Sequence, residues 1–296
     1  MKQVRKALIP VAGLGTRMFP ATKSVLKAML PVVTPDGVCK PVIQTILEEA
    51  LSAGCEEIAL VIRPEDEAVF RSFLSPVGDE LFARLPEAQK KEEQMLRDLG
   101  KCTTFLFQKE QLGLGHALSL AKDWVGGENV LVLLGDHIFY SNESRTCARQ
   151  LVDAFANHGC KDIVSLYPVD GENVHHYGTA TGNWLDDAKT TLSLTEFTEK
   201  PSLEYARGHL AMQGLANDSF LCVFGQYVLT PQLFAILEGQ IKRGVKQKNE
   251  FQLTTALDEL RATSGMNGYV VNGEHYDTGQ PKEYVRSLAA FADVFD

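Results

Sequence analysis

Residues 7–17 read ALIPVAGLGTR, a short apolar run that is followed at once by the glycine turn Gly13-Leu14-Gly15. An apolar run of this length that stops at glycines is typical of a buried strand entering a tight turn. Similar apolar runs recur along the chain, at 58–62, 103–107, 130–134 and 163–167. Because these runs are apolar on both faces and alternate with segments of helical spacing, they predict an α/β fold with a mostly parallel sheet covered by helices.

The helical segments have apolar residues three and four positions apart. They lie at 43–53, 65–74, 115–125, 147–158, 231–241, 251–262 and 281–295. After residue 170 the alternation loosens, and we expect an antiparallel excursion over 179–198 that turns at Gly182-Asn183, with strands at 221–228 and 268–273. The charged stretch 74–101 reads as a helical insertion or a mobile loop.

No repeat or Pro/Ser-rich linker interrupts the chain, so we expect one domain over residues 1–296. The amphipathic segment 280–296 is a candidate subunit contact, and packing on its own sheet is the equally weighted alternative. We expect a homo-oligomer, a dimer or a tetramer.

Composition excludes several classes of protein. The chain has 296 residues, 45% hydrophobic and 23% charged, which is ordinary for a globular protein. Its net charge of -9 argues against nucleic-acid binding, which needs clustered positive charge. No apolar stretch is long enough for a membrane span or a secretory signal. The six cysteines lack metal-site spacing, so we expect reduced thiols and a cytoplasmic protein.

The charge is unevenly distributed, because residues 1–35 contain six basic side chains and no acidic one. Three of the cations, Arg17, Lys23 and Lys27, lie in or just after the glycine turn. The Walker A pattern is absent, and the dinucleotide fingerprint fails because Met18 stands where its third glycine belongs. A glycine turn with fixed cations suits a ligand with several phosphates, although a plain strand-to-helix turn with solvated charges has the same pattern.

The longer string AGLGTRMFPATKSVLKAMLP at 12–31 resembles the sugar-1-phosphate nucleotidyltransferases. The resemblance continues through the segments at 107–117, 134–136, 177–178, 199–201, 250–254 and 276–279. It implies a three-layer α/β/α Rossmann-like fold with a central, mostly parallel (mixed) sheet.

Within that family, the string is most similar to bacterial enzymes that act on UTP and glucose 1-phosphate. The implied reaction is Mg²⁺-dependent and yields UDP-glucose and pyrophosphate. The sugar phosphate attacks the α-phosphorus in line and no protein nucleophile takes part, so positioning and charge neutralisation carry the catalysis. The implied partners are therefore a nucleoside triphosphate and a sugar 1-phosphate.

The resemblance also implies a role for each matching residue. The catalytic set is Arg17, Lys27 and Lys200; the nucleotide set is Ala12, Gly13, Gly15, Thr16, Gln108 and Gly113; the sugar set is Gly178 and Glu199; the metal ligands are Asp136 and Asp277. Arg17 suits the leaving phosphates because it keeps its charge and offers forked donors. Gln108 offers a donor and an acceptor, which suits the imide edge of uracil. The plain alternatives are solvated surface cations and turn-capping aspartates.

Five positions depart from the family pattern. Leu26 and Ala28 replace a proline and a glutamate beside Lys27, Thr255 replaces an aspartate, Gln226 replaces an arginine, and His137 follows the metal aspartate where an acidic or small residue is usual. The change at 28 weakens the inference to uridine and the change at 226 weakens the inference to glucose.

Three alternatives to the uridylyl reaction stay open at this point. The first is the same chemistry with dTTP or another hexose 1-phosphate. The second is a non-catalytic regulatory paralogue that binds nucleotide sugar, against which the retained charged residues argue. The third, a nicotinamide oxidoreductase, fails at Met18. We assign no metal or acid–base role to His116, His175 or His176, and expect the adjacent pair to point to opposite sides of an extended chain.

Overall fold

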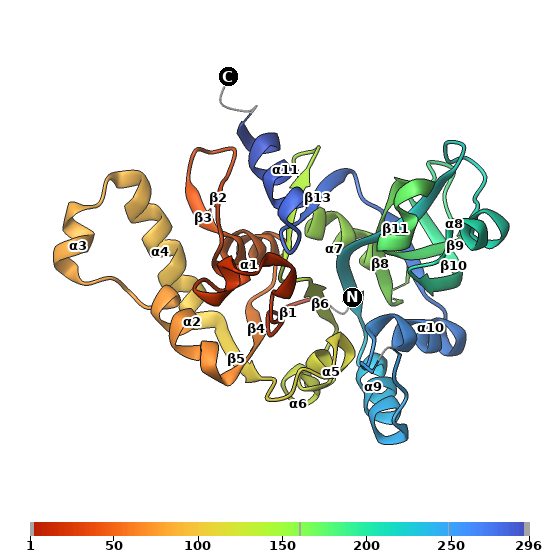
Figure 1. Cartoon of the computed structure of the whole chain (residues 1–296), viewed down its shortest axis with the longest axis horizontal. Helices are drawn as coiled ribbons and strands as arrows, with labels where there is room; N and C mark the ends of the chain where they lie inside the picture. The colour runs from red at the N-terminus through yellow and green to blue at the C-terminus, as the bar shows by residue number, and fades with distance from the viewer. Residues whose placement is uncertain (1–2, 160, 248, 293–296) are drawn as a thin grey trace.

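The computed structural model describes residues 3–159, 161–247 and 249–292. Its central feature is a mixed sheet that runs through the whole molecule (Figure 1). In spatial order, the described strands of this sheet are β5 (Thr103–Phe107), β4 (Glu57–Ile62), β1 (Lys6–Pro10), β6 (Val130–Leu133), β11 (Ser219–Leu229), β8 (Ile163–Asp170), β12 (Asn267–Val270), β10 (Thr191–Glu199) and β9 (Gly178–Trp184). The chain is therefore an α/β protein, as the alternating pattern predicts.

The expectation of a mostly parallel sheet is correct only for its N-terminal half. Strands β5, β4, β1 and β6 pair in parallel. Strand β11 then pairs antiparallel with β6, β8 and β9, and β10 pairs antiparallel with β12 and β9, which leaves β8–β12 as the one parallel pair in this half of the described sheet. Because β9 contacts both β10 and β11, the strands β11, β8, β12, β10 and β9 form a closed ring.

Helices cover both faces of the sheet. One hydrophobic cluster includes Ala7 and Ile9 of β1 and packs under α1 (Val42–Ser52), α2 (Glu67–Leu74), α4 (Glu87–Cys102) and α7 (Cys147–Asn157). The cluster on the other face includes Leu8 and packs under α5 (Leu114–Ser119), α6 (Lys122–Val125), α9 (Gln232–Arg243) and α10 (Leu253–Ser264). Alternate residues of one strand thus enter opposite cores, which explains why its sequence is apolar throughout.

The remaining elements lie around this core. The short sheet of β2 (Pro31–Val33) and β3 (Cys39–Pro41) contacts α11 (Pro281–Ala292) through β2, and α8 (Leu203–Tyr205) contacts the short helical segments Gly171–His176 and Ala206–Leu210. Helix α3 (Asp79–Arg84) and α4 form an arm that projects from one edge of the molecule in Figure 1, so the stretch 74–101 is a helical insertion. The predicted helix at 281–295 ends beyond the described residues.

Two local predictions in the second half are wrong. The hairpin 179–198 does not turn at Gly182-Asn183, because Gly182 lies inside β9, where a Cβ atom would meet the Ser193 carbonyl oxygen at 2.1 Å. Its glycine permits a close strand contact. The turn instead lies after Trp184, where the Asp186 carboxylate accepts from the Thr190 and Thr191 amides at 2.8 Å each.

The predicted strand at 268–273 is two strands in different sheets. Strand β12 ends at Val270, and β13 (Gly273–Asp277) pairs antiparallel with β7 (His137–Ser141), which the sequence reading missed. Likewise, the predicted helix 115–125 is divided into α5 and α6.

Within the described ranges, no helix is both long and apolar enough to cross a bilayer. Five of the six cysteines lie in those ranges and all five are free thiols, whereas Cys160 lies outside the described residues.

Candidate functional site

A cavity of about 810 Å³ lies beyond the carboxyl ends of β1 and β6, where ligands of open α/β sheets bind. Every residue to which the sequence analysis gave a role lines it. These residues are Ala12, Gly13, Gly15, Thr16, Arg17, Lys27, Gln108, Gly113, Asp136, Gly178, Glu199, Lys200 and Asp277. Segments far apart in the chain thus meet around one space.

The glycine loop, residues 11–17, lines one side of the cavity. Strand β1 ends at Pro10, and Gly15 adopts a φ of 63°, which is the left-handed region that glycine enters most easily. A Cβ atom at Gly15 would lie 2.9 Å from a Thr22 methyl group, and the Thr22 hydroxyl donates to the Gly15 carbonyl at 3.0 Å. The turn is therefore fixed by close packing, and it delivers Arg17 to the cavity.

The two aspartates are brought together by the β7–β13 ribbon. His137 is the register partner of Asp277, and the amide and hydroxyl of Thr278 both donate to the Asp136 carbonyl at 2.8 Å. The signal that could have revealed β7 is the β-prone run Ile138-Phe139-Tyr140 directly after Asp136. Its pairing with β13 could not be read from either segment alone.

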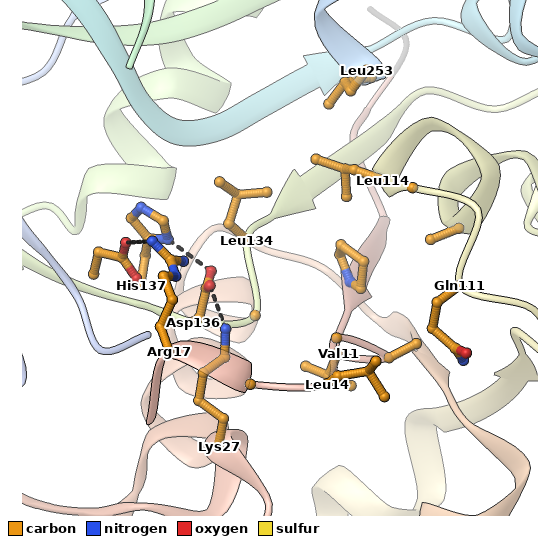
Figure 2. A pocket seen from close by; sticks show the side chains of 18 of the residues that line it. Val11, Leu14, Arg17, Lys27, Gln111, Leu114, Leu134, Asp136, His137 and Leu253 are labelled. Carbon is orange, nitrogen blue, oxygen red and sulfur yellow. Dashed lines mark hydrogen bonds and ion pairs between the residues drawn. The ribbon is translucent and has the colours of Figure 1, made fainter. Parts of the chain in front are cut away.

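Each aspartate faces a cation of the glycine-loop region, and Figure 2 shows the pair of Asp136 and Lys27. Lys27 Nζ lies 2.5 Å from Asp136 Oδ2, and Arg17 Nη1 lies 3.5 Å from Asp277 Oδ2. Burial alone would raise the pKa of the Asp136 carboxyl, but the Lys27 charge and the His137 hydrogen bond outweigh it and hold that pKa well below its ordinary value. Asp136 is therefore ionised at any physiological pH.

The carboxylates of Asp136 and Asp277 and the imidazole of His137 form a donor cluster. One ligand atom of each lies within 4.8 Å of the others, and His137 Nδ1 is 3.0 Å from Asp136 Oδ1. Two carboxylates and an imidazole at this spacing are a donor set that a divalent cation accepts. The sequence analysis identified the two aspartates but gave His137 no role.

The opposite end of the cavity is less polar, since Val11, Leu14 and Leu114 line it together with Gln111 (Figure 2). Gln108 is buried there at the end of β5. Its Nε2 lies 3.0 Å from His116 Nδ1 and 3.2 Å from the Gly113 carbonyl oxygen. Burial lowers the pKa of His116, which favours the neutral ring that can accept this bond. The two bonds use both amide hydrogens, so Gln108 can offer a ligand only its oxygen. The expectation that it offers a base both a donor and an acceptor is therefore wrong.

A third side of the cavity carries Gly178, Glu199 and Lys200. The Thr254 hydroxyl donates to Glu199 Oε2 at 2.6 Å, and Lys200 Nζ lies 3.6 Å from Glu199 Oε1. Lys200 has a φ of 48°, and its amide donates to the Tyr177 carbonyl at 3.1 Å. This local bend directs a cation and a carboxylate into the same space.

The adjacent histidines differ from expectation. His175 and His176 belong to a 3₁₀ segment, Gly171–His176, and their ring centroids are 3.9 Å apart. The prediction that they point to opposite sides of an extended chain is therefore wrong. Both line the cavity outside the carboxylate cluster.

The departures from the family pattern fall into two groups. Leu26, Ala28 and His137 line the cavity. In contrast, Gln226 is fully buried in the sheet, where it donates to Glu49 Oε1 at 3.1 Å, and Thr255 is also outside the cavity lining. The sequence analysis took the glutamine at 226 as evidence against a glucose substrate. That interpretation is wrong, because this side chain faces the core rather than a ligand.

The fold and the cavity define an α/β protein in which a cationic glycine loop and a carboxylate pair share one binding space. Comparison with known proteins is more specific. A family model described as "Nucleotidyl transferase" matches residues 6–293, and the chain belongs to this family. The resemblance seen in the sequence is confirmed.

Two relatives carry the description UTP–glucose-1-phosphate uridylyltransferase. The protein of Staphylococcus epidermidis is 34% identical over 307 residues and that of Staphylococcus haemolyticus 36% over 298, and each alignment covers 99% of this chain and 93% of the relative.

Similar solved structures include a UDP-glucose pyrophosphorylase complexed with UDP-glucose (TM-score 0.79, 28% identity, covering 98% of this chain and 99% of the other). A UTP-bound UGPase from Acinetobacter baumannii has a TM-score of 0.77 and 27% identity over 98% of this chain and 93% of its own.

Proposed function

We propose that this chain joins UTP to α-D-glucose 1-phosphate and releases UDP-glucose and pyrophosphate. The observation that carries the proposal is the division of one cavity into a charged end, with Arg17 and Lys27 facing Asp136 and Asp277, and an apolar end that holds Gln108. Relatives of nearly equal length carry the name of this activity, and similar structures hold UTP or UDP-glucose.

Gln108 supports the choice of a uracil base. Its amide hydrogens are held by His116 and Gly113, so the group of the amide that is left for a ligand is the acceptor oxygen. Uracil offers an N3–H donor at its imide edge, whereas cytosine offers an acceptor there, and two facing acceptors leave both groups unpaired. Thymine has the same imide edge. Since Ala28 lines the cavity and departs from the family pattern, dTTP is the second candidate triphosphate.

The charged end suits the reacting groups. Arg17 binds the leaving β- and γ-phosphates with forked, permanently charged donors, and Lys27 offsets charge at the α-phosphate. Lys200 orients the sugar phosphate, and Glu199, held by Thr254, accepts hydrogen bonds from sugar hydroxyls beside Gly178. The sugar phosphate then attacks the α-phosphorus directly, and holding the two anions in line supplies most of the catalysis.

The donor cluster fits the divalent cation that this chemistry uses. Asp136 and Asp277 would hold Mg²⁺, which takes one or two protein carboxylates together with phosphate oxygens. When bound, the cation would neutralise charge on the phosphates as it develops.

The helices on both faces of the sheet support a three-layer, Rossmann-like arrangement within a single domain. A homo-oligomeric state and a cytoplasmic location stay predictions.

A pyrophosphate-release assay over a panel of triphosphates and hexose 1-phosphates tests the proposal. We expect the highest kcat/KM with UTP and glucose 1-phosphate, and lower values with dTTP and with galactose 1-phosphate. If no pair of substrates in the panel is turned over but UDP-glucose binds tightly, the result would instead indicate a non-catalytic regulatory relative.

A further inference from the structure

We infer that His137 is a third protein ligand of the divalent cation, and that it shifts the preference of the site from Mg²⁺ towards first-row transition cations. The inference rests on the proposed function, because it takes the carboxylates of Asp136 and Asp277 as the place where the cation binds. What is new is the imidazole nitrogen, which adds a ligand of a different chemical kind to this pair of oxygens.

The spacing of the donor atoms matches coordination by one ion. His137 Nδ1 and Asp136 Oδ1 are 3.0 Å apart. Adjacent ligands of an octahedral ion with bonds of about 2.1 Å are also about 3.0 Å apart, so these two atoms already have the separation of neighbouring ligands. Binding requires only that the shared proton leaves and that the two groups turn slightly towards the ion. The third donor lies on Asp277, and one ligand atom from each of the three residues lies within 4.8 Å of the others, close to the span of about 4.2 Å between opposite ligands of such an ion.

The ion pair between Asp136 and Lys27 leaves the position beside Asp136 Oδ1 and His137 Nδ1 accessible to a cation. Lys27 contacts Oδ2 of the carboxylate, whereas His137 faces Oδ1. A cation between Oδ1 and Nδ1 therefore does not require the Lys27 pair to break. Figure 2 shows Lys27 and His137 approaching Asp136 from different directions.

The imidazole ring is held in place before any ligand binds. It is stacked on the His275 ring, with centroids 5.0 Å apart and planes inclined by 17°, and its side chain is only 12% exposed. Strand β11 approaches it closely, because a Cβ atom at Gly225 would lie 3.4 Å from the ring. A packed ring has little rotamer freedom left to lose when it binds an ion.

The chemistry of the donor set decides the preference. Mg²⁺ favours oxygen ligands, whereas an imidazole nitrogen strengthens binding of Co²⁺, Ni²⁺ and Zn²⁺. The plain alternative is that His137 only donates a hydrogen bond to Asp136 and orients it. An asparagine at 137 separates the two roles, because its amide can still donate this bond but is a poor ligand for a transition cation.

The test measures metal binding directly on the whole chain after removal of metal with a chelator. Co²⁺ and Mg²⁺ affinities are compared by calorimetry in the wild type, His137→Asn and the control His176→Ala, which removes another imidazole of the same cavity. We expect His137→Asn to weaken Co²⁺ binding at least about tenfold and to change Mg²⁺ binding by less than about twofold. His176→Ala should bind both ions as the wild type does.

Pulsed EPR of bound Mn²⁺ gives a second readout, since a coordinated imidazole couples its nitrogen to the metal spin. We expect this nitrogen coupling in the wild type and in His176→Ala, and its loss in His137→Asn. If the wild type lacks the coupling, or His137→Asn keeps both the coupling and the Co²⁺ affinity, the ligand assignment is wrong.

Neither measurement needs turnover, so the two proposals fail separately. Nitrogen coupling without UDP-glucose synthesis would refute the proposed function and leave the assignment of His137 in place. UDP-glucose synthesis without nitrogen coupling would support the proposed function and refute the assignment of His137 as a ligand.

Discussion

Glu49 provides the sharpest prediction about stability. Its carboxylate is buried in α1, where Oε1 accepts hydrogen bonds from the Ala148 amide at 2.6 Å and from Gln226 Nε2 at 3.1 Å. These bonds do not offset the loss of water, and burial raises the pKa of Glu49 from 4.5 to about 7. An arginine at 226 would place a permanent cation near Glu49 and lower the pKa of its carboxyl, whereas the glutamine in this chain is uncharged.

The sign of the pH dependence follows from the direction of the shift. Below pH 4.5 the acid is protonated in both the folded and the unfolded chain, so its contribution to stability is fully present. As pH rises towards 7, the unfolded chain releases the proton and the folded chain keeps it, so stability falls. The complete loss corresponds to about 3 kcal/mol, of which roughly 1 kcal/mol falls between pH 6 and pH 8.

The assay is urea denaturation at pH 6 and pH 8 for the wild type, Glu49→Gln and the control Glu204→Gln, which changes an exposed carboxylate. Glutamine resembles the protonated acid, so Glu49→Gln should lack this loss and exceed the wild type at pH 8 by up to about 3 kcal/mol. Glu204→Gln should follow the wild type. Equal pH slopes in the wild type and Glu49→Gln would refute the reasoning.

Three further predictions concern the cavity. Asp136→Asn should lower kcat at least about a hundredfold with an unchanged circular dichroism spectrum, because it removes a carboxylate from the donor cluster; full activity would contradict the metal assignment. Arg17→Ala should raise KM for UTP on the order of tenfold and KM for glucose 1-phosphate less, because a charged hydrogen bond to phosphate is worth about 1.5–3 kcal/mol; equal increases in steady-state kinetics would contradict its role. His116→Ala should lower the UTP-to-CTP ratio of kcat/KM roughly tenfold, because the Gln108 amide can then rotate and donate; an unchanged ratio would exclude this positioning.

Local patterns were enough to predict much of the fold. The apolar run that becomes β1 (Lys6–Pro10) was predicted within two residues, because burial on both faces requires uninterrupted apolar residues there. The strand at 103–107 was also predicted, although it lies at the edge of the sheet and is only partly buried. The glycine turn at 13–15 was found for the same kind of reason, since its backbone conformation and close packing restrict the residues it can contain.

Pairings between distant segments could not be predicted in this way. Nothing in the run 137–141 indicates that it pairs with 273–277, yet this ribbon brings the two aspartates together. Gln226 illustrates a related difficulty. A polar residue in a family motif suggests a ligand contact, and only the direction in which the strand faces shows that its partner is Glu49 in the core.

The two ion pairs at the charged end of the cavity differ, and the difference indicates which cation moves first when a triphosphate enters. Arg17 faces Asp277, and Lys27 faces Asp136. The Arg17–Asp277 contact is longer, 3.5 Å against 2.5 Å, and the Arg17 side chain is far more exposed than that of Lys27. Since attraction weakens with distance and with solvent exposure, a phosphate should draw Arg17 away from its carboxylate more easily than Lys27. We therefore expect Lys27 to keep its contact with Asp136 in a UTP complex while Arg17 turns to the phosphates. A complex in which Arg17 remains on Asp277 and Lys27 has left Asp136 would contradict this order.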